Sequence, residues 1–284
     1  MTRHLPLPQR LIEARVQTVL DEDLGDAGDI TTRATIPAET QGKAMIRARK
    51  PGSLAGIELA ETAFRLVSPD VDLKRHCADG TKLSAGNDIL EISGPARAIL
   101  SAERVALNFL GHLSGIATAT AALVNAVDGT DVKIVCTRKT LPGLRALQKY
   151  AVTCGGGFNH RFGLYDAVMI KDNHIAACGS ITEALRAAKA RLGHMVKIEI
   201  EVDTIAQLEE VLREGADVIL LDNMKTDQLR EAVKLTKGRA ILEASGNITL
   251  ETVRRVAETG VDVISSGWIT HSAPNLDLGL DYMS

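Results

Sequence analysis

The sequence predicts an α/β protein whose second half is a parallel barrel and whose first half is a separate α+β domain. Three observations support this fold class. Short runs of β-branched residues recur through the second half, amphipathic segments with helix signals at both ends lie between the later runs, and the first half lacks this alternation. With 284 residues, the chain is long enough for two domains or for one barrel.

The first half combines helical and strand patterns without a repeating unit. Helices are expected near residues 9–23 and 57–67, and the alternation in KAMIRARK predicts a strand. The segments VDLKRHCA and DILEIS are also strand-like. Residues 96–127 are rich in Ala and Leu and predict a helical bridge between the two parts, with a break near Ser114 and Gly115.

The second half contains six β-branched runs that we expect to be buried strands. From Val196 onward, successive runs start about 22 residues apart, which is the length of a strand, a helix and two short loops. Ser180 with Glu183 and Thr204 with Gln207 form capping boxes at two of the intervening helices. The runs begin at Val132, Ala167, Val196, Asp217, Ala240 and Asp262.

The alternation of strands and helices is compatible with two architectures. A closed α/β barrel is favoured, because no Gly-rich dinucleotide-binding segment follows the first strand of the repeat. An open doubly wound sheet has the same alternation, so the periodicity does not exclude it.

The composition argues against several classes of partner. Lys and Arg number 33 against 36 Asp and Glu, and this net charge of −3 predicts neither a nucleic acid partner nor an anionic membrane partner. No uninterrupted apolar run reaches the roughly 18 residues of a spanning helix, and Pro6 and Pro8 stand where a signal peptide would be apolar. The four cysteines lack a C-x-x-C pair, which indicates reduced thiols. A cytoplasmic location is therefore expected.

Polar residues close the predicted strands of the second half. Because ligands of parallel α/β proteins bind at the carboxyl ends of the strands, these residues are candidates for a site. Two Ser-Gly pairs among them precede expected helix starts, where backbone N–H groups can face a phosphate. The candidates are Thr137, Arg138, Lys139, Lys171, Glu201, Asp222, Ser245, Gly246, Ser266 and Gly267.

Residues 137–171 are positively charged within a slightly negative chain. Six Lys and Arg stand there against one acid, Asp166. Arginine binds carboxylates and phosphates through paired hydrogen bonds and lysine acts as a point charge, so this stretch favours a small ligand with several negative charges. The loop GGGFNHR within it allows a ligand to approach the backbone and carries His160 and Arg161.

Two acids, Glu201 and Asp222, close consecutive predicted strands. Neighbouring carboxylates in this position are suited to a hydrated magnesium ion, to sugar hydroxyls or to acid–base chemistry. A structural ion pair with a nearby Lys is the alternative. The residues alone do not decide between these uses.

Six segments together resemble the quinolinate phosphoribosyltransferase family, the carboxylating nicotinate-nucleotide pyrophosphorylases. The match spans nearly the whole chain, and TRKT, PGLR, GGGFNHR and IKDNH in this order are its most specific part. The segments are LDEDLGDAGDITT (20–32), ERVALNFLGHLSGIAT (103–118), TRKTLPGLRALQKYAV (137–152), GGGFNHRFGLYDAVMIKDNH (155–174), EASGNI (243–248) and HSAPNLDLGL (271–280).

The resemblance implies a fold, a reaction and an assembly. The fold is an N-terminal open-faced α+β sandwich, residues 1–112 joined by 271–284, and an incomplete parallel α/β barrel, residues 113–270. The reaction is that of a transferase of de novo NAD biosynthesis. With Mg²⁺, it moves phosphoribose from 5-phosphoribosyl-1-pyrophosphate (PRPP) to quinolinate, giving nicotinate mononucleotide, pyrophosphate and carbon dioxide. The assembly is a homodimer or a larger homo-oligomer.

The resemblance also implies roles for individual residues. The pyridine dicarboxylate would be held by Arg138, His160, Arg161, Lys171 and, from the other subunit, Arg104. The donor would be bound by Lys139, its ribose and metal by Glu201 and Asp222, and its 5-phosphate by Ser245, Gly246, Asn247 and Gly267. Thr137 and Ser266 complete the binding set, and the catalytic residues would be Lys139, Lys171, Glu201 and Asp222. Trp268 departs from the family pattern and would narrow the 5-phosphate site.

Three other functions are weighed against this one. A relative associated with molybdenum transport shares TRKT and the HR pair, but the intact KDNH string argues against it. A Schiff-base lyase would use Lys171 at a strand end, yet it gives Arg138 and Arg161 no role. A non-catalytic anion-binding module would not need the acids Glu201 and Asp222.

Overall fold

The computed structural model describes residues 5–283 and divides the chain into two compact units. Unit 1 comprises the chain up to residue 121, residues 146–156 and the chain from residue 273 onward. Unit 2 comprises residues 122–145 and 157–272. The boundary predicted between residues 112 and 113 falls inside one long helix, Ala96–Ala126.

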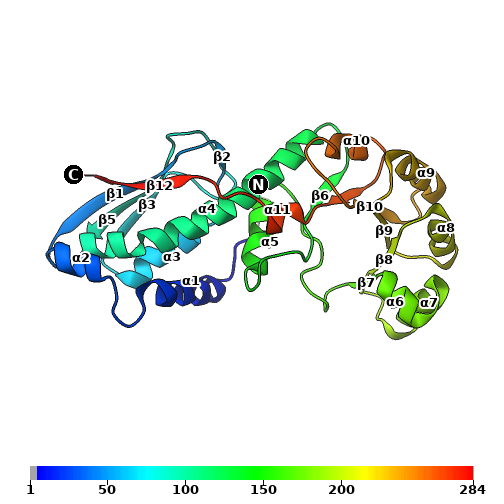
Figure 1. Cartoon of the computed structure of the whole chain (residues 1–284), viewed down its shortest axis with the longest axis horizontal. Helices are drawn as coiled ribbons and strands as arrows, with labels where there is room; N and C mark the ends of the chain where they lie inside the picture. Colours follow the sequence, from blue (N-terminus) through cyan, green and yellow to red (C-terminus); the bar gives the residue numbers. More distant parts are fainter. Residues whose placement is uncertain (1–4, 284) are drawn as a thin grey trace. The chain divides into compact units, whose positions relative to one another are not determined.

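Unit 1 is built on a four-stranded antiparallel sheet in the order β12-β1-β5-β3. In its register, Ile46 lies opposite both Leu280 and Leu90, and Ile46 and Leu90 are fully buried. The strands are β1 (Gln41–Ala48), β3 (Asp72–Arg75), β5 (Asp88–Pro95) and β12 (Leu278–Met283), with a small sheet of β2 (Gly52–Ser53) and β4 (Lys82–Leu83). Figure 1 shows α3 and α4 running alongside the strands. The helices are α1 (Gln9–Leu24), α2 (Ile30–Thr35), α3 (Ile57–Val67), α4 (Ala96–Ala126) and most of α5 (Arg145–Cys154).

The long helix α4 is continuous through Ser114 and Gly115, so the predicted break there is wrong. A Cβ on Gly115 would lie 2.2 Å from the main-chain oxygen of Pro274, and Ser114 Oγ accepts the N–H of Ala55 at 3.0 Å. These small residues allow close packing rather than ending the helix. By length and composition α4 could cross a membrane, but 67% of its most apolar window is buried inside the protein, as in a core helix.

Unit 2 contains a six-stranded parallel sheet in the order β6-β11-β10-β9-β8-β7. Its edge strands, β6 and β7, do not pair with each other in the described chain, and residues 146–156 between them belong to unit 1. The closed barrel favoured by the periodicity is therefore wrong, and the incomplete barrel implied by the resemblance is confirmed. The strands are β6 (Lys133–Val135), β7 (Val168–Ile170), β8 (Ile198–Val202), β9 (Val218–Asp222), β10 (Ile241–Ser245) and β11 (Val263–Ser265).

Helices follow the strands of unit 2, and α7, α8 and α9 lie outside the curve of its sheet in Figure 1. The predicted capping box of Thr204 and Gln207 is confirmed, with both reciprocal hydrogen bonds present. At Ser180 the hydroxyl accepts the N–H of Glu183, whereas the Glu183 carboxylate bonds the same hydroxyl instead of the main chain. The helices are α6 (Asp172–Cys178), α7 (Ile181–Arg191), α8 (Ile205–Glu214), α9 (Thr226–Thr236), α10 (Val253–Ala257) and α11 (Trp268–His271).

Candidate active site

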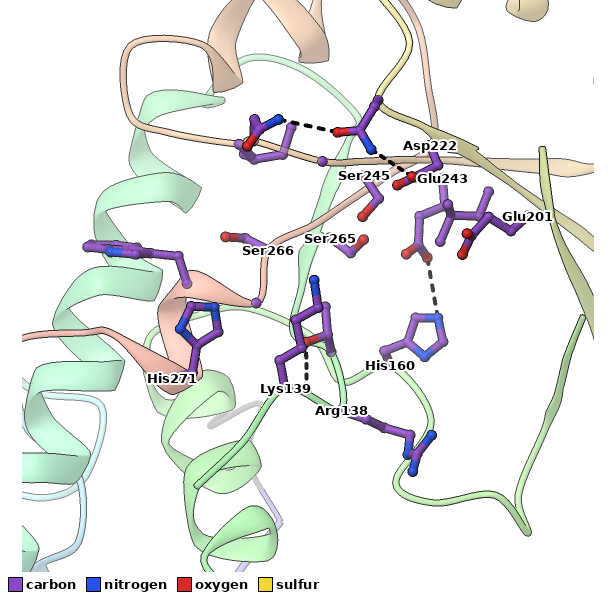
Figure 2. Close-up of a pocket in the computed structure, with 18 of the residues that line it drawn as sticks. Arg138, Lys139, His160, Glu201, Asp222, Glu243, Ser245, Ser265, Ser266 and His271 are labelled. Carbon is purple, nitrogen blue, oxygen red and sulfur yellow. Dashed lines mark hydrogen bonds and ion pairs between the residues drawn. The ribbon is translucent and has the colours of Figure 1, made fainter. Parts of the chain in front are cut away.

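A cavity of about 1150 Å³ opens at the carboxyl ends of the unit 2 strands (Figure 2). Parallel strands bring residues that are distant in sequence to one edge, and Asp222 at the end of β9 lies opposite Ser245 at the end of β10. The predicted residues that line the cavity are Thr137, Arg138, Lys139, His160, Arg161, Lys171, Glu201, Asp222, Ser245, Gly246, Asn247, Ser266 and Gly267. Arg104 lies on α4 in unit 1, where its side chain is exposed.

Two arginines of the cavity lining each have a buried Nε without a hydrogen-bond partner. The Nε atoms of Arg138 and Arg161 are buried and have no hydrogen-bond partner among the described residues. One Nη of Arg161 donates to the main-chain oxygen of Ala167 at 3.1 Å, which fixes one side of the guanidinium. Burial and the nearby Arg138 charge lower the pKa of Arg161. An anionic ligand beside the two guanidinium groups would relieve the repulsion between the two cations.

Carboxylates offset the positive charge that the sequence placed in residues 137–171. Lys171 forms an ion pair with Glu201, and the Asp222 carboxylate accepts the side-chain N–H of Asn223 at 2.7 Å. The cations that line the cavity are Arg138, Lys139, Arg161 and Lys171, and the carboxylates that line it are Glu201, Asp222, Glu243 and Glu251. The cavity therefore combines carboxylates with cations, of which Lys171 is paired with Glu201.

Two basic residues of the same stretch lie elsewhere. Lys149 is fully buried in unit 1, and Arg145 donates to Thr140 and to the main-chain oxygen of Phe162. Neither lines the cavity. The count of basic residues along the chain thus overstated the charge of the site.

The turn after β10 has a constrained backbone. Gly246 has φ 99°, and Asn247 and, in the turn after β9, Asn223 have φ 51° and 53°. A Cβ on Gly246 would lie 2.1 Å from the side-chain oxygen of Asn223, so only glycine allows this close approach. Left-handed backbone at non-glycine residues is unfavourable and concentrates at ligand sites. Sequence reasoning found Gly246 and Asn247 but missed Asn223.

A helix was expected directly after each of the pairs Ser245-Gly246 and Ser266-Gly267, but only one of the two is followed at once by a helix. Gly267 leads directly into α11, and Trp268 in its first turn lines the cavity with 38% of its surface exposed. After Ser245 and Gly246, by contrast, α10 does not begin until Val253. A helix N-terminus adjoins only the second pair, so the expectation for the first pair is wrong.

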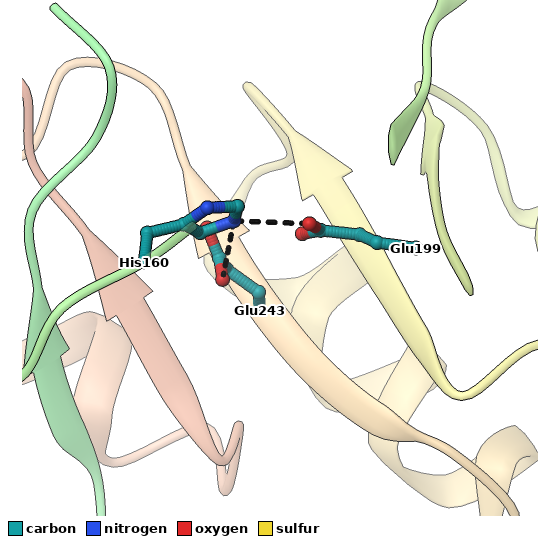
Figure 3. Close-up of side chains that lie close together, drawn as sticks. All are labelled: His160, Glu199 and Glu243. Atoms are coloured by element: carbon teal, nitrogen blue, oxygen red, sulfur yellow. Dashed lines mark ion pairs between the residues drawn. The ribbon is translucent and has the colours of Figure 1, made fainter. Parts of the chain in front are cut away.

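An acidic cluster behind His160 was also missed (Figure 3). Glu199 on β8 and Glu243 on β10 point toward the imidazole from inside the sheet. Burial and the Glu199 charge raise the pKa of Glu243 to about 7. The signal was present in the sequence: Glu199 and Glu243 stand two residues before Glu201 and Ser245, and residues two apart on a strand share a face.

The sequence matches one family over both units. Residues 29–114 match the N-terminal domain and residues 116–281 the C-terminal domain of the quinolinate phosphoribosyl transferase family. A probable nicotinate-nucleotide pyrophosphorylase [carboxylating] of Bacillus subtilis is 50% identical over 260 residues, which cover 92% of this chain and 89% of the relative. The nicotinate-nucleotide pyrophosphorylase [carboxylating] of Mycobacterium leprae is 47% identical over 272 residues, covering 94% and 95%.

The fold also matches solved structures. The crystal structure of NadC from Streptococcus pyogenes is similar with a TM-score of 0.94 and 42% identity, covering 99% of this chain and 100% of that one. The nicotinate-nucleotide pyrophosphorylase from Francisella tularensis has a TM-score of 0.94 and 37% identity, with 98% of each chain covered. Sequence and fold thus agree on one family and favour it over the alternatives weighed above.

Proposed function

The chain belongs to the quinolinate phosphoribosyltransferase family, and on this premise we propose how its cavity performs the reaction of that family. The reaction transfers phosphoribose from PRPP to quinolinate and releases pyrophosphate and carbon dioxide. Nicotinate mononucleotide, the product, enters de novo NAD biosynthesis. The chain is thus a transferase that joins a pyridine ring to a sugar phosphate.

The observation that supports the acid site most strongly is the pair of unsatisfied arginines. Arg138 and Arg161 each carry a buried Nε donor without an acceptor, and quinolinate carries two carboxylates on adjacent ring carbons. Hydrogen bonds to these carboxylates would be charge-assisted and geometrically selective. We assign Arg138 and Arg161 to the dicarboxylate, with Lys171 on the same side of the site and His160 behind them.

The opposite part of the cavity suits the donor. The constrained turn at Ser245, Gly246 and Asn247 and the start of α11 at Gly267 line this part of the cavity, and the backbone N–H groups of such turns and helix starts can bind phosphate. We assign them, with Ser266 and Thr137, to the 5-phosphate region of PRPP. Lys139 lies against Gly267 and is assigned to the donor. The exposed indole of Trp268 borders this region and limits its width.

The chemistry requires alignment and charge rather than a base. The pyridine nitrogen is already a nucleophile, so the site must bring it to the anomeric carbon while pyrophosphate leaves. The sugar becomes cationic, and the carboxylates of Glu201 and Asp222 would stabilise it, while Lys139 and Lys171 would stabilise leaving negative charge. The positive charge of the quaternary ring nitrogen then stabilises the electron pair that stays on the adjacent ring carbon when its carboxylate departs as carbon dioxide, and a proton from solvent water takes the place of the carboxylate. Decarboxylation therefore follows transfer.

Magnesium is part of this proposal. Glu201 stands one residue before the end of β8, Asp222 ends the neighbouring β9, and both line one cavity. Hard carboxylate oxygens are the ligands that Mg²⁺ prefers, so the residues fit the ion. They would hold it directly or through water and the donor. Bound there, the ion would neutralise pyrophosphate charge. The ion pair between Lys171 and Glu201 would then have to loosen.

Turnover tests the proposal directly. The protein is mixed with quinolinate, PRPP and Mg²⁺, and release of carbon dioxide and formation of nicotinate mononucleotide are followed. Glu201→Gln and Asp222→Asn should lower kcat more than quinolinate affinity, because their charge matters chiefly as the sugar becomes cationic. Equal losses of quinolinate affinity and turnover would contradict their assignment.

Assembly is the remaining part of the proposal. Arg104 is an exposed arginine on a helix of unit 1, and we propose that it enters the site of a partner subunit in a homodimer or larger homo-oligomer. Mixing Arg104→Ala and Lys171→Ala chains tests this assignment. Sites shared between subunits should regain activity after subunit exchange, because one site of a heterodimer is then intact. Continued inactivity after demonstrated exchange would place the whole site within one chain.

A further inference from the structure

His160 connects a buried acidic pair to the arginines of the cavity (Figure 3). Its Nε2 lies 2.9 Å from Glu199 Oε2 and 3.7 Å from Glu243 Oε2. The glutamate side chains are 7% and 5% exposed, and that of His160 is 13% exposed. All three side chains are thus largely shielded from water, so the hydrogen bonds and charges among them are weakly screened.

The hydrogen bonds fix the tautomer of His160. Its Nδ1 accepts the main-chain N–H of Arg161 at 2.8 Å, so Nδ1 carries no proton. The proton is therefore on Nε2, which donates to Glu199. Three such side chains would otherwise suit a metal ion, but an ion at this place would need the lone pair of Nε2. The observed hydrogen bonds favour a chain of donors and acceptors instead.

The second oxygens of both glutamates are unsatisfied. Glu199 Oε1 and Glu243 Oε1 are buried and have no hydrogen-bond partner among the described residues. Side chains that serve stability alone are normally fully bonded when buried, because an unpaired buried charge opposes folding. The Glu199 carboxylate raises the pKa of Arg161, in opposition to Arg138, so its charge reaches the cavity arginines. The unfavourable burial of two acids indicates a functional use.

We propose that Glu199 and Glu243 are positioning residues. Glu199 accepts the Nε2–H of His160 and Glu243 adds a nearby negative charge, so that Nδ1 of His160 fixes the main chain of Arg161 beside Arg138. This inference rests on the proposed function, in which the two arginines bind the dicarboxylate. It also changes the role of His160, because both ring nitrogens are engaged by protein groups. His160 acts behind Arg161 rather than as a direct donor to the acid.

Substrate selectivity is the first readout. In Glu199→Gln, the Kd and KM for quinolinate should rise about tenfold, because the charged acceptor of His160 Nε2–H and the countercharge of Arg161 are lost. Glu243→Gln should raise both values less, because Glu243 acts on His160 through charge alone. The KM for PRPP and kcat should change little. Glu209→Gln is the matched control, since it removes an exposed carboxylate from α8 of the same unit and should change none of these values. Unchanged quinolinate affinity, or equal losses for both substrates, would overturn the proposal.

The tautomer is the second readout, and it does not depend on substrate. In protein with ¹⁵N-labelled histidine, the His160 signals are assigned by their loss in His160→Asn. Wild-type protein should show protonated Nε2 and unprotonated Nδ1, and Glu199→Gln should shift the Nε2 signal. A proton on Nδ1 in the wild type would overturn the proposal, even if a variant failed to fold. Absence of turnover in wild-type protein with an intact tautomer would instead refute the proposed function alone.

Discussion

Each unit of the molecule buries acids, and one acid from each unit shows how differently they are bonded. In unit 1 the Asp79 carboxylate accepts the N–H groups of Gly56 and Ile57 and the hydroxyl of Tyr150, at 3.0, 3.0 and 2.6 Å. In unit 2 one oxygen of Glu243 has no partner among the described residues. Asp79 thus belongs to a closed network, in which both of its oxygens accept hydrogen bonds. Glu243 belongs to an open network, in which a buried oxygen still lacks a donor.

The same contrast holds for the wider set of unsatisfied atoms. Across residues 5–283, the buried side-chain atoms without a hydrogen-bond partner all lie in unit 2. They belong to Arg138, Arg161, Glu199, Glu243 and Ser265. The two units therefore differ in whether their buried polar groups are hydrogen-bonded, and this distinguishes the supporting unit from the unit that contains the site. Buried polar groups whose hydrogen bonds are all formed support the fold. Buried polar groups that lack a hydrogen bond mark where a ligand binds or a proton is held.

The largest expected effect is on the closed network. Asp79→Ala should destabilise the protein by about 3 kcal/mol, because it removes the cap of α3 and leaves buried donors unpaired. Urea unfolding followed by circular dichroism measures this loss. Asp72→Ala, at an exposed position on β3, is the matched control. A small effect of Asp79→Ala would mean that Tyr150 and the N-terminus of α3 find other partners.

The arginines of the open network should behave in the opposite way. Arg138→Ala or Arg161→Ala should weaken quinolinate binding by roughly 1.5 to 3 kcal/mol, because a charged hydrogen bond to a carboxylate is lost. Stability should change little in Arg138→Ala, since the removed Nε had no protein partner, and fall slightly in Arg161→Ala, which also loses the bond to the main-chain oxygen of Ala167. Calorimetric titration with quinolinate and thermal unfolding measure the two quantities. Unchanged affinity in both variants would show that the acid binds elsewhere.

The pH dependence of stability sharpens the contrast further. Glu243 has a folded-state pKa of about 7, above the 4.5 of an unperturbed glutamate. Between these values the folded state retains a proton that the unfolded state has lost, so stability falls as the pH rises through this window. Glu243→Gln cannot ionise and should gain a few degrees in Tm relative to wild type between pH 5 and pH 8. A pH-independent difference in Tm would contradict this origin of the effect.

The smallest effect is expected at the surface of unit 2. Arg230 and Asp227 form an ion pair on α9, and the Asp227 side chain is 94% exposed. Asp227→Ala should change stability by less than about 1 kcal/mol, because exposed pairs are screened by water and salt. Urea unfolding at low and high salt measures it. A larger loss would show that charge outside the buried networks also contributes to the fold.

The sequence predicted the elements of both units well, because their signals are local. The alternation in KAMIRARK became β1, and the helix expected at residues 57–67 is α3. That the sheet stays open was not predictable from periodicity, since a closed and an open sheet have the same alternation of strands and helices. The break expected at Gly115 failed for a similar reason. A glycine in a helix can serve a distant contact, here with Pro274, that no local pattern records.

The candidate site divides in the same way. Residues at strand ends, such as Glu201 and Asp222, were found because the topology of parallel sheets determines where strand ends meet. Asn223 was missed, since its left-handed backbone is visible only in three dimensions. Glu199 and Glu243 were missed because attention to strand ends passed over acids within the strands. Their partner His160 lies in a loop far from both acids in the sequence, and a contact of this kind leaves no periodic pattern from which it could be predicted.

The strand β12 has a consequence for how the protein is made. It supplies the edge of the unit 1 sheet and pairs along β1, although most of that sheet comes from the first hundred residues. On the ribosome, the strands β6 to β11 emerge before β12, so the parallel sheet can assemble while one side of β1 is still unpaired. Nascent chains stalled before residue 278 should therefore expose the unpaired backbone N–H and C=O groups of β1. Chaperones that bind unpaired strand edges should bind these chains until β12 has been made.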